Sequence, residues 1–90
     1  MEVVRNNAED LRAFAEYFEN FCANLEADSQ TLQNLFDELS QIWRDRQNER
    51  MSGKMEAFRK MIRDFNRRSA GVPDHLRELA NLIDDYDDNR

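Results

Sequence analysis

The 90-residue chain has few of the residues that interrupt or cross-link a fold: two glycines, one proline and one cysteine. Their scarcity, together with apolar residues that recur periodically, favours helix and argues against disorder. The lone Cys22 cannot form an intrachain disulfide, so the fold does not depend on an oxidising compartment. No segment approaches the roughly 18 apolar residues of a membrane span, and residues 1–7 lack the apolar core of a cleaved signal. We therefore expect a protein made in the cytoplasm, exported, if at all, without a signal peptide.

Patterns of catalytic and metal-binding residues are also missing. Cys22 falls on the predicted apolar side of a helix, where a buried thiol without a neighbouring base is unreactive. His75 follows Asp74 and could titrate near neutral pH, but a lone surface histidine usually carries no function. There is no Glu-x-x-His or paired Cys/His spacing for a metal. We expect no enzyme activity, no metal and no cofactor.

The chain does contain a long heptad pattern. The first series consists of Leu11, Phe18, Leu25, Leu32 and Leu39, and a second series alternates steps of four and three from Met51 to Tyr86. This spacing predicts long helices, each with a continuous apolar side. Because a polar stretch from Trp43 to Asn48 separates the two series, the predicted fold is all-α: an antiparallel hairpin of two long helices.

The expected boundaries follow from capping and breaking residues. Asn6 or Asn7 can cap the first helix, and Pro73 removes an amide donor, so a kink or break is expected there. The predicted single domain, 1–90, comprises a first helix over about 7–43, a turn at about 44–48, a second helix over about 49–70, a terminal helical segment over about 73–85 and an acidic tail over 86–90.

Two residues are candidates for the cap of the second helix. With Asp45 as N-cap, Gly53 lies inside the helix at a cost of about 1 kcal/mol relative to alanine. With Ser52 as cap, residues 45–51 form a longer loop. A tight connection suits antiparallel neighbours, which favours Asp45.

Charge is distributed unevenly along the chain. Residues 1–45 carry a net charge of −7, residues 46–68 carry +5 and residues 69–90 carry −4, which together give −6. Folding the basic segment beside the acidic first helix would support a hairpin by modest, salt-sensitive terms, although the same asymmetry could act between chains.

Basic residues cluster in the second half of the chain, at Arg59, Lys60, Arg63, Arg67 and Arg68. Such a cluster, interleaved with Phe58 and Phe65, could contact phosphate. However, the two acidic flanks would repel nucleic acid or an anionic membrane. An acidic partner, within the chain or in another one, is therefore the better interpretation, and we expect no nucleic acid.

The apolar side of the first helix is wider than a two-helix seam. Phe14, Phe21, Leu35 and Ile42 fill a second heptad position, and Ala15, Cys22, Phe36 and Trp43 fill the adjacent one. One partner helix cannot cover three positions in seven, so Phe14, Phe21, Phe36 and Trp43 would be left uncovered. Two hairpins closing into a four-helix bundle solve this. The predicted buried layers are Phe14, Phe18, Phe21, Leu25, Leu32, Phe36, Leu39, Trp43, Phe58, Ile62 and Phe65.

The turn sequence resembles a known family. Trp43-Arg44-Asp45, preceded by Leu35, Phe36, Leu39 and Ile42 and followed by Phe58, is similar in spacing to the Trp-x-Gly turn of the WXG100 family, the ESAT-6-like proteins of type VII secretion. The resemblance implies a small homo- or heterodimer that is a secreted substrate or a secretion adaptor.

Two positions depart from the family pattern. Asp45 stands in place of glycine, which an N-cap role would accommodate. Tyr86 is followed four residues later by Arg90, where the family's export signal has an acid.

The sequence therefore predicts a non-enzymatic protein–protein interaction module that pairs with another helical hairpin, either a second copy or a related chain. Secretion machinery or a larger secreted effector is a further expected partner. The alternative is a cytoplasmic helical-bundle adaptor that binds an amphipathic helix of another protein and has no connection with secretion.

Overall fold

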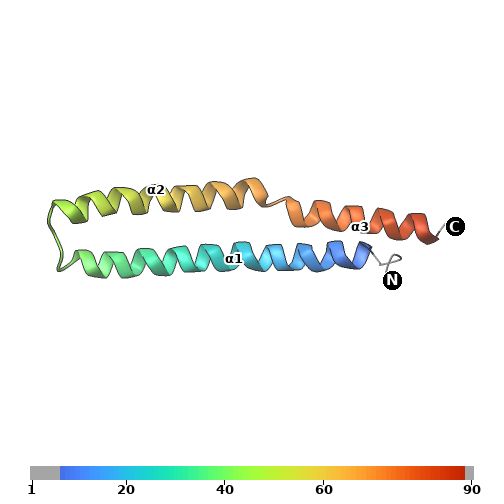
Figure 1. Cartoon of the computed structure of the whole chain (residues 1–90), viewed down its shortest axis with the longest axis horizontal. Helices are drawn as coiled ribbons and strands as arrows, with labels where there is room; N and C mark the ends of the chain where they lie inside the picture. Colours follow the sequence, from blue (N-terminus) through green and yellow to red (C-terminus); the bar gives the residue numbers. More distant parts are fainter. Residues whose placement is uncertain (1–6, 89–90) are drawn as a thin grey trace. The chain divides into compact units, whose positions relative to one another are not determined.

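The computed structural model describes residues 7–88, which contain three helices: α1 (Asn7–Ser40), α2 (Arg46–Ser69) and α3 (Val72–Asp88) (Figure 1). The chain divides into two compact units. Unit 1 combines Met1–Phe21 with Ser69–Arg90, and unit 2 is Cys22–Arg68. In each unit a stretch of α1 packs beside a helix that returns, α3 in unit 1 and α2 in unit 2. The predicted all-α helical hairpin is confirmed; that the chain acts as one domain stays a prediction.

The first helix ends earlier than predicted. It was expected to reach about Trp43, but α1 stops at Ser40. The amides of Gln41 and Ile42 donate to carbonyls three residues back, at 3.1 Å each. These are the bonds of a tighter, 3₁₀-type turn, which ends the α-helical pattern before Trp43. Such three-residue bonds are a common way to satisfy the last carbonyls of a helix.

Asp45 begins the second helix. Its Oδ1 accepts hydrogen bonds from the amides of Gln47 at 2.9 Å and Asn48 at 3.2 Å, which are the contacts of an N-cap. Ser52 lies inside α2, so the first of the two alternatives holds. The helix starts at Arg46, three residues before the expected position, because the cap satisfies its first amides.

Removing this cap is expected to weaken the fold. Asp45→Ala leaves two amides of the first turn without their acceptor, so the free energy of unfolding should fall by about 1 kcal/mol. Urea denaturation measures the change. Ser52→Ala, inside the same helix, should change it by less than about 0.5 kcal/mol. Equal losses in the two variants would mean that Asp45 does not act as the cap.

Gly53 is a position where the fold can be stabilised. It lies in α2 and is exposed, its φ is not positive, and a Cβ added there would meet nothing within 4 Å. Gly53→Ala should therefore raise the free energy of unfolding by about 0.5–1 kcal/mol, because alanine loses less backbone entropy in a helix. Ala27→Gly, at an exposed position of α1, should lower it by a similar amount. A loss on Gly53→Ala would contradict the helical assignment of this turn.

Unit 2 is held together by the heptad row of α1 that contains Cys22 and Phe36. Ser29 and Phe36, seven residues apart, are buried, and Cys22 is half-buried in the same row. They face α2, whose buried residues are Met55 and Ile62. The leucine series lies at the margin of this contact, since Leu32 and Leu39 are each 44% exposed.

In unit 1, the buried contact is made of small residues. Ala8 and Ala15 of α1 and Ala80 of α3 are fully buried, each with 0% exposure. Small side chains at a helix contact allow the two backbones to approach closely. The α1 row in this unit has the same seven-residue spacing as the row in unit 2.

The break near Pro73 is confirmed. Helix α2 ends at Ser69, and α3 starts at Val72, so Pro73 is the second residue of α3. A missing amide costs no hydrogen bond in the first turn, and the amide of His75 makes the bond to the Gly71 carbonyl at 3.0 Å.

The third helix is longer than predicted and continues to Asp88. Residues 86–88, expected as part of an acidic tail, are therefore helical, while residues 89–90 lie outside the described range. None of the helices in residues 7–88 is long and apolar enough to cross a membrane.

Candidate interaction surface

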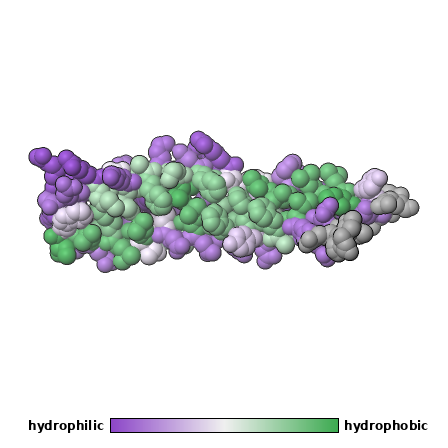
Figure 2. All heavy atoms as spheres, viewed as in Figure 1, coloured by the Kyte–Doolittle hydropathy of each residue, from purple (hydrophilic) through white to green (hydrophobic). Residues whose placement is uncertain are grey.

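In unit 2, α1 presents a row of large apolar side chains to solvent. Leu32, Leu35 and Leu39 are all exposed, and Ile42, which follows the end of α1, is 85% exposed. Figure 2 shows hydrophobic residues at the molecular surface, bordered by hydrophilic residues. Contiguous exposed apolar residues on a soluble protein mark sites where another protein binds.

Unit 1 carries a comparable set of exposed apolar residues. From α1 these are Phe14, Tyr17 and Phe21, and from α3 they are Val72, Leu79, Leu82 and Tyr86. The rings of Phe14 and Phe18 lie 6.1 Å apart at 30°. We call the exposed large apolar residues of α1, taken in each unit by itself, the α1 pairing surface: Phe14, Tyr17 and Phe21 in unit 1, and Leu32, Leu35 and Leu39 in unit 2.

The other edge of the helix contact in unit 1 is polar. Arg12 donates to Asn81 at 2.8 Å and pairs with Asp84 at 2.7 Å, and Arg77 makes two bonds to the Glu19 carboxylate at 2.8 and 2.9 Å. Arg12 lies four residues after the buried Ala8, whereas Phe14 lies six after it. At 3.6 residues per turn these two offsets fall on opposite sides of the buried row. The apolar residues are therefore exposed on the side away from these polar bonds.

The pairing of Glu19 with Arg77 makes unit 1 sensitive to acid. Hydrogen bonds from Arg77 lower the pKa of Glu19 below its ordinary value of 4.5. A lowered pKa in the folded state stabilises the fold above the ordinary pKa, and this contribution is lost as pH falls through the lower folded pKa.

Glu19→Gln should therefore flatten the loss of thermal stability below about pH 4.5, compared with the original chain. Melting temperatures between about pH 3 and 7 measure this. Glu16→Gln, at an exposed position of the same helix, is the matched control. If both variants follow the original pH curve, the Glu19–Arg77 pair does not contribute to stability.

Unit 2 is joined across its helices by hydrogen bonds without charge pairing. Arg59 donates to Gln30 at 3.1 Å, and Asn66 donates to the Cys22 carbonyl at 3.4 Å and to Glu26 at 3.5 Å. Over the described residues, no ion pair joins α1 to α2. No such ion pair therefore supports the hairpin in unit 2, and that the charge asymmetry acts between chains stays a prediction. Its bases find a nearer acid, since Lys60 and Arg67 both pair with Asp64 of their own helix at 3.4 and 3.1 Å.

The residues predicted for the buried layers fall into three groups. Phe36 and Ile62 are buried; Phe18, Leu25, Trp43 and Phe58 are half-buried; Phe14, Phe21, Leu32, Leu39 and Phe65 are exposed. The prediction that Phe36 stays uncovered by the hairpin is thus wrong, because it belongs to the row that faces α2. Sequence reasoning missed Tyr17, Met61 and Leu82 as exposed apolar residues. Met61, four residues before Phe65, was the available signal for a wider apolar side on α2.

Two residues considered for chemistry have unremarkable surroundings. Cys22 is a half-buried free thiol. His75 is exposed, and its Nδ1 lies 3.9 Å from a carboxylate oxygen of Glu78 in the same helix. Within residues 7–88, no three His, Cys, Asp or Glu side chains gather where they could hold a metal ion.

A family model described as proteins of 100 residues with WXG matches residues 4–88. The chain belongs to the WXG100 family. Members of this family are non-enzymatic helical proteins that pair as helical hairpins, and they are secreted by a route independent of signal peptides. In this WXG100 chain, the third position of the motif is Asp45, the N-cap of α2. No curated protein and no solved structure matches the chain.

Proposed function

We propose that this WXG100 protein is an interaction module that pairs with a second helical hairpin, closing a four-helix bundle, and acts as a secreted substrate or a secretion adaptor. The observation that carries the proposal is the α1 pairing surface. Its residues are large, apolar and exposed, and in unit 1 they lie away from the polar edge of the helix contact.

Pairing would remove this surface from water. Each fully buried leucine or phenylalanine contributes about 1.5–3 kcal/mol. A monomer gains only part of this, since its own returning helices cover a different row of α1 and leave Leu32 and Leu39 each 44% exposed. A second hairpin supplies the missing helices, and a bundle of four buries an apolar side of three positions in seven. The predicted layer residues Leu25, Phe58 and Ile62 would then lie beneath the new interface.

Sedimentation velocity at micromolar concentration tests the pairing. A homodimer should have a mass near twice 10.8 kDa. Two copies with different tags, expressed together, should then be recovered together. A monomer that persists to about 100 μM, where pairing of even modest affinity would be populated, would contradict self-pairing and leave only a related chain as mate.

Export is a separate part of the proposal. Tyr86 lies in α3, and Arg90 occupies the position at which the resemblance implies an acid. We propose that a related chain, paired with this one, supplies the complete export signal, because a second copy would carry the same Arg90. The chain should then appear in the medium only when its mate is also expressed and the ATPase of the secretion machinery is intact. Export of the chain without a mate would contradict this step.

A further inference from the structure

Helix α2 carries a positive charge that no ion pair with α1 offsets among the described residues. Over residues 46–68 there are eight basic and three acidic side chains, a net charge of +5. The ion pairs made by its bases within the described part of the chain are Lys60 and Arg67 with Asp64, both inside α2. Because no ion pair links this helix to the acidic residues of α1, its charge remains available to a partner.

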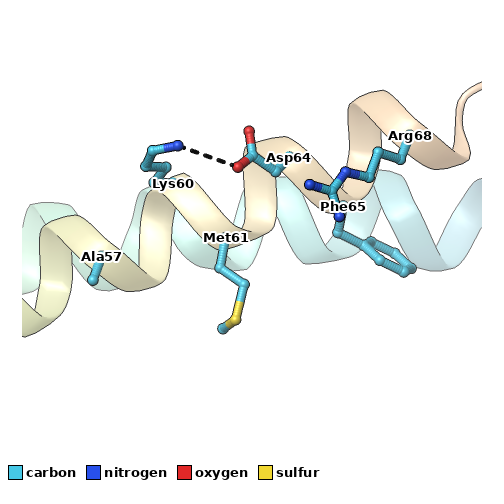
Figure 3. A pocket seen from close by; sticks show the side chains of 6 residues that line it. All are labelled: Ala57, Lys60, Met61, Asp64, Phe65 and Arg68. Carbon is cyan, nitrogen blue, oxygen red and sulfur yellow. Dashed lines mark hydrogen bonds and ion pairs between the residues drawn. The ribbon is translucent and has the colours of Figure 1, made fainter.

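The same helix has an open groove next to these charges. Ala57, Met61 and Phe65 follow one another at steps of four, and Lys60, Asp64 and Arg68 complete the lining of a cavity of about 480 Å³. Figure 3 shows Met61 and Phe65 projecting from the same side of α2, while Lys60 and Asp64 are joined along the other edge. Met61 is 59% exposed. The groove thus combines an apolar row with cationic side chains.

Asp64 does not oppose an acidic ligand as strongly as its position suggests. Lys60 donates to it and Arg67 pairs with it, and the hydrogen bond from Lys60 is the main reason that its pKa is lowered. The carboxylate is therefore kept charged by two neighbouring cations, which offset its field. Arg63 and Arg68 form no hydrogen bond or ion pair with an acid in residues 7–88.

We propose that this groove binds an acidic amphipathic helix of another protein. The row from Ala57 to Phe65 spans nine residues, and its ends lie about 12 Å apart along the helix. About two turns of a partner can cover it with apolar residues at steps of three or four. Acidic side chains on its flanks would meet Lys60 and Arg68. Charge complementarity of this kind sets the partner and its orientation. This binding site goes beyond hairpin pairing, which uses the α1 pairing surface.

Nucleic acid fits the groove less well. Phosphate groups gain no favourable contact with the apolar row. In addition, unit 1 carries a net charge of −7, which repels a polyanion. An acidic helix needs both the cations and the row. Binding of an acidic helix and binding of a nucleic acid should therefore be weakened by different substitutions.

A labelled peptide provides the test. The probe is a helical peptide of about 18 residues with three leucines at steps of four and glutamates on the flanks, followed by fluorescence anisotropy with the full chain at about 0.15 M salt. Lys60→Gln with Arg68→Gln should weaken binding about tenfold, and Met61→Ser should do so by a similar factor. Arg46→Gln with Arg50→Gln removes the same charge outside the groove and should weaken it less than about twofold.

Several results would overturn the proposal. One is failure of the probe to bind; another is equal binding of a peptide whose leucines are replaced by serine, which would leave only non-specific charge attraction. Displacement by an equal concentration of single-stranded DNA would make the partner a nucleic acid. If Lys60→Gln with Arg68→Gln changes the mass in sedimentation, the groove holds a second copy. Unaltered pairing in that variant, with weaker peptide binding, supports the proposal and leaves the hairpin dimer intact.

Discussion

Leu35→Asp is expected to convert the proposed dimer to a monomer without unfolding the hairpin. Leu35 is 57% exposed, so a carboxylate there remains hydrated in the monomer. In the paired state the charge would be buried in an apolar interface. Substitutions at the centre of such interfaces cost about 2–4 kcal/mol, which raises the dissociation constant by roughly 30- to 1,000-fold. Sedimentation velocity over a concentration series measures the shift, and circular dichroism checks that helix content is unchanged.

Thr31→Asp adds the same charge at an exposed polar position of α1 and should leave the dimer intact. Phe21→Asp tests the same surface in unit 1, where Phe21 is 46% exposed, and should dissociate the dimer as well. If Thr31→Asp acts as strongly as Leu35→Asp, the α1 pairing surface has been assigned to the wrong residues.

The hairpin itself could be predicted because heptads report helices directly. The row of α1 residues that faces the returning helix could not be predicted. Leucine and phenylalanine at positions such as Leu32 outrank alanine and serine in hydrophobicity, yet Ala15 and Ser29 are the buried residues. Three adjacent heptad positions all read as apolar in α1, so the pattern does not say which of them a single neighbour covers. That choice depends on how closely the two helices approach, and small residues permit the closest approach.

Local chemistry was more predictable than long-range charge. The Asp45 cap follows from contacts between residues only two and three apart, so the sequence contains both partners of each bond. A net charge summed over a segment does not identify which residues will form ion pairs. Lys60 pairs with an acid four residues away in its own helix, which costs less side-chain ordering than reaching across to α1. The positive charge of α2 follows from the sequence, and an acidic partner for it in another chain stays a prediction.

Phe36→Ala is expected to destabilise the hairpin more than any other single substitution considered. Phe36 is the largest buried side chain of α1, at 9% exposure, and it packs in the row that faces Met55 and Ile62. Truncating a buried phenylalanine costs about 3–5 kcal/mol, since transfer energy is lost and a cavity remains.

The loss from Phe36→Ala is large for a chain of this size, because small domains bury little surface and are only marginally stable. Urea denaturation should show a much lower midpoint, or an unfolded chain at the start. Leu35→Ala, one residue earlier but exposed, should cost less than about 1 kcal/mol in the monomer, because its side chain touches mainly water. The adjacent pair thus separates the two roles of α1: Phe36 packs inside the hairpin, and Leu35 belongs to the surface proposed to contact a second hairpin. Equal losses of monomer stability in the two variants would show that α1 is rotated from the orientation described, with Leu35 facing α2.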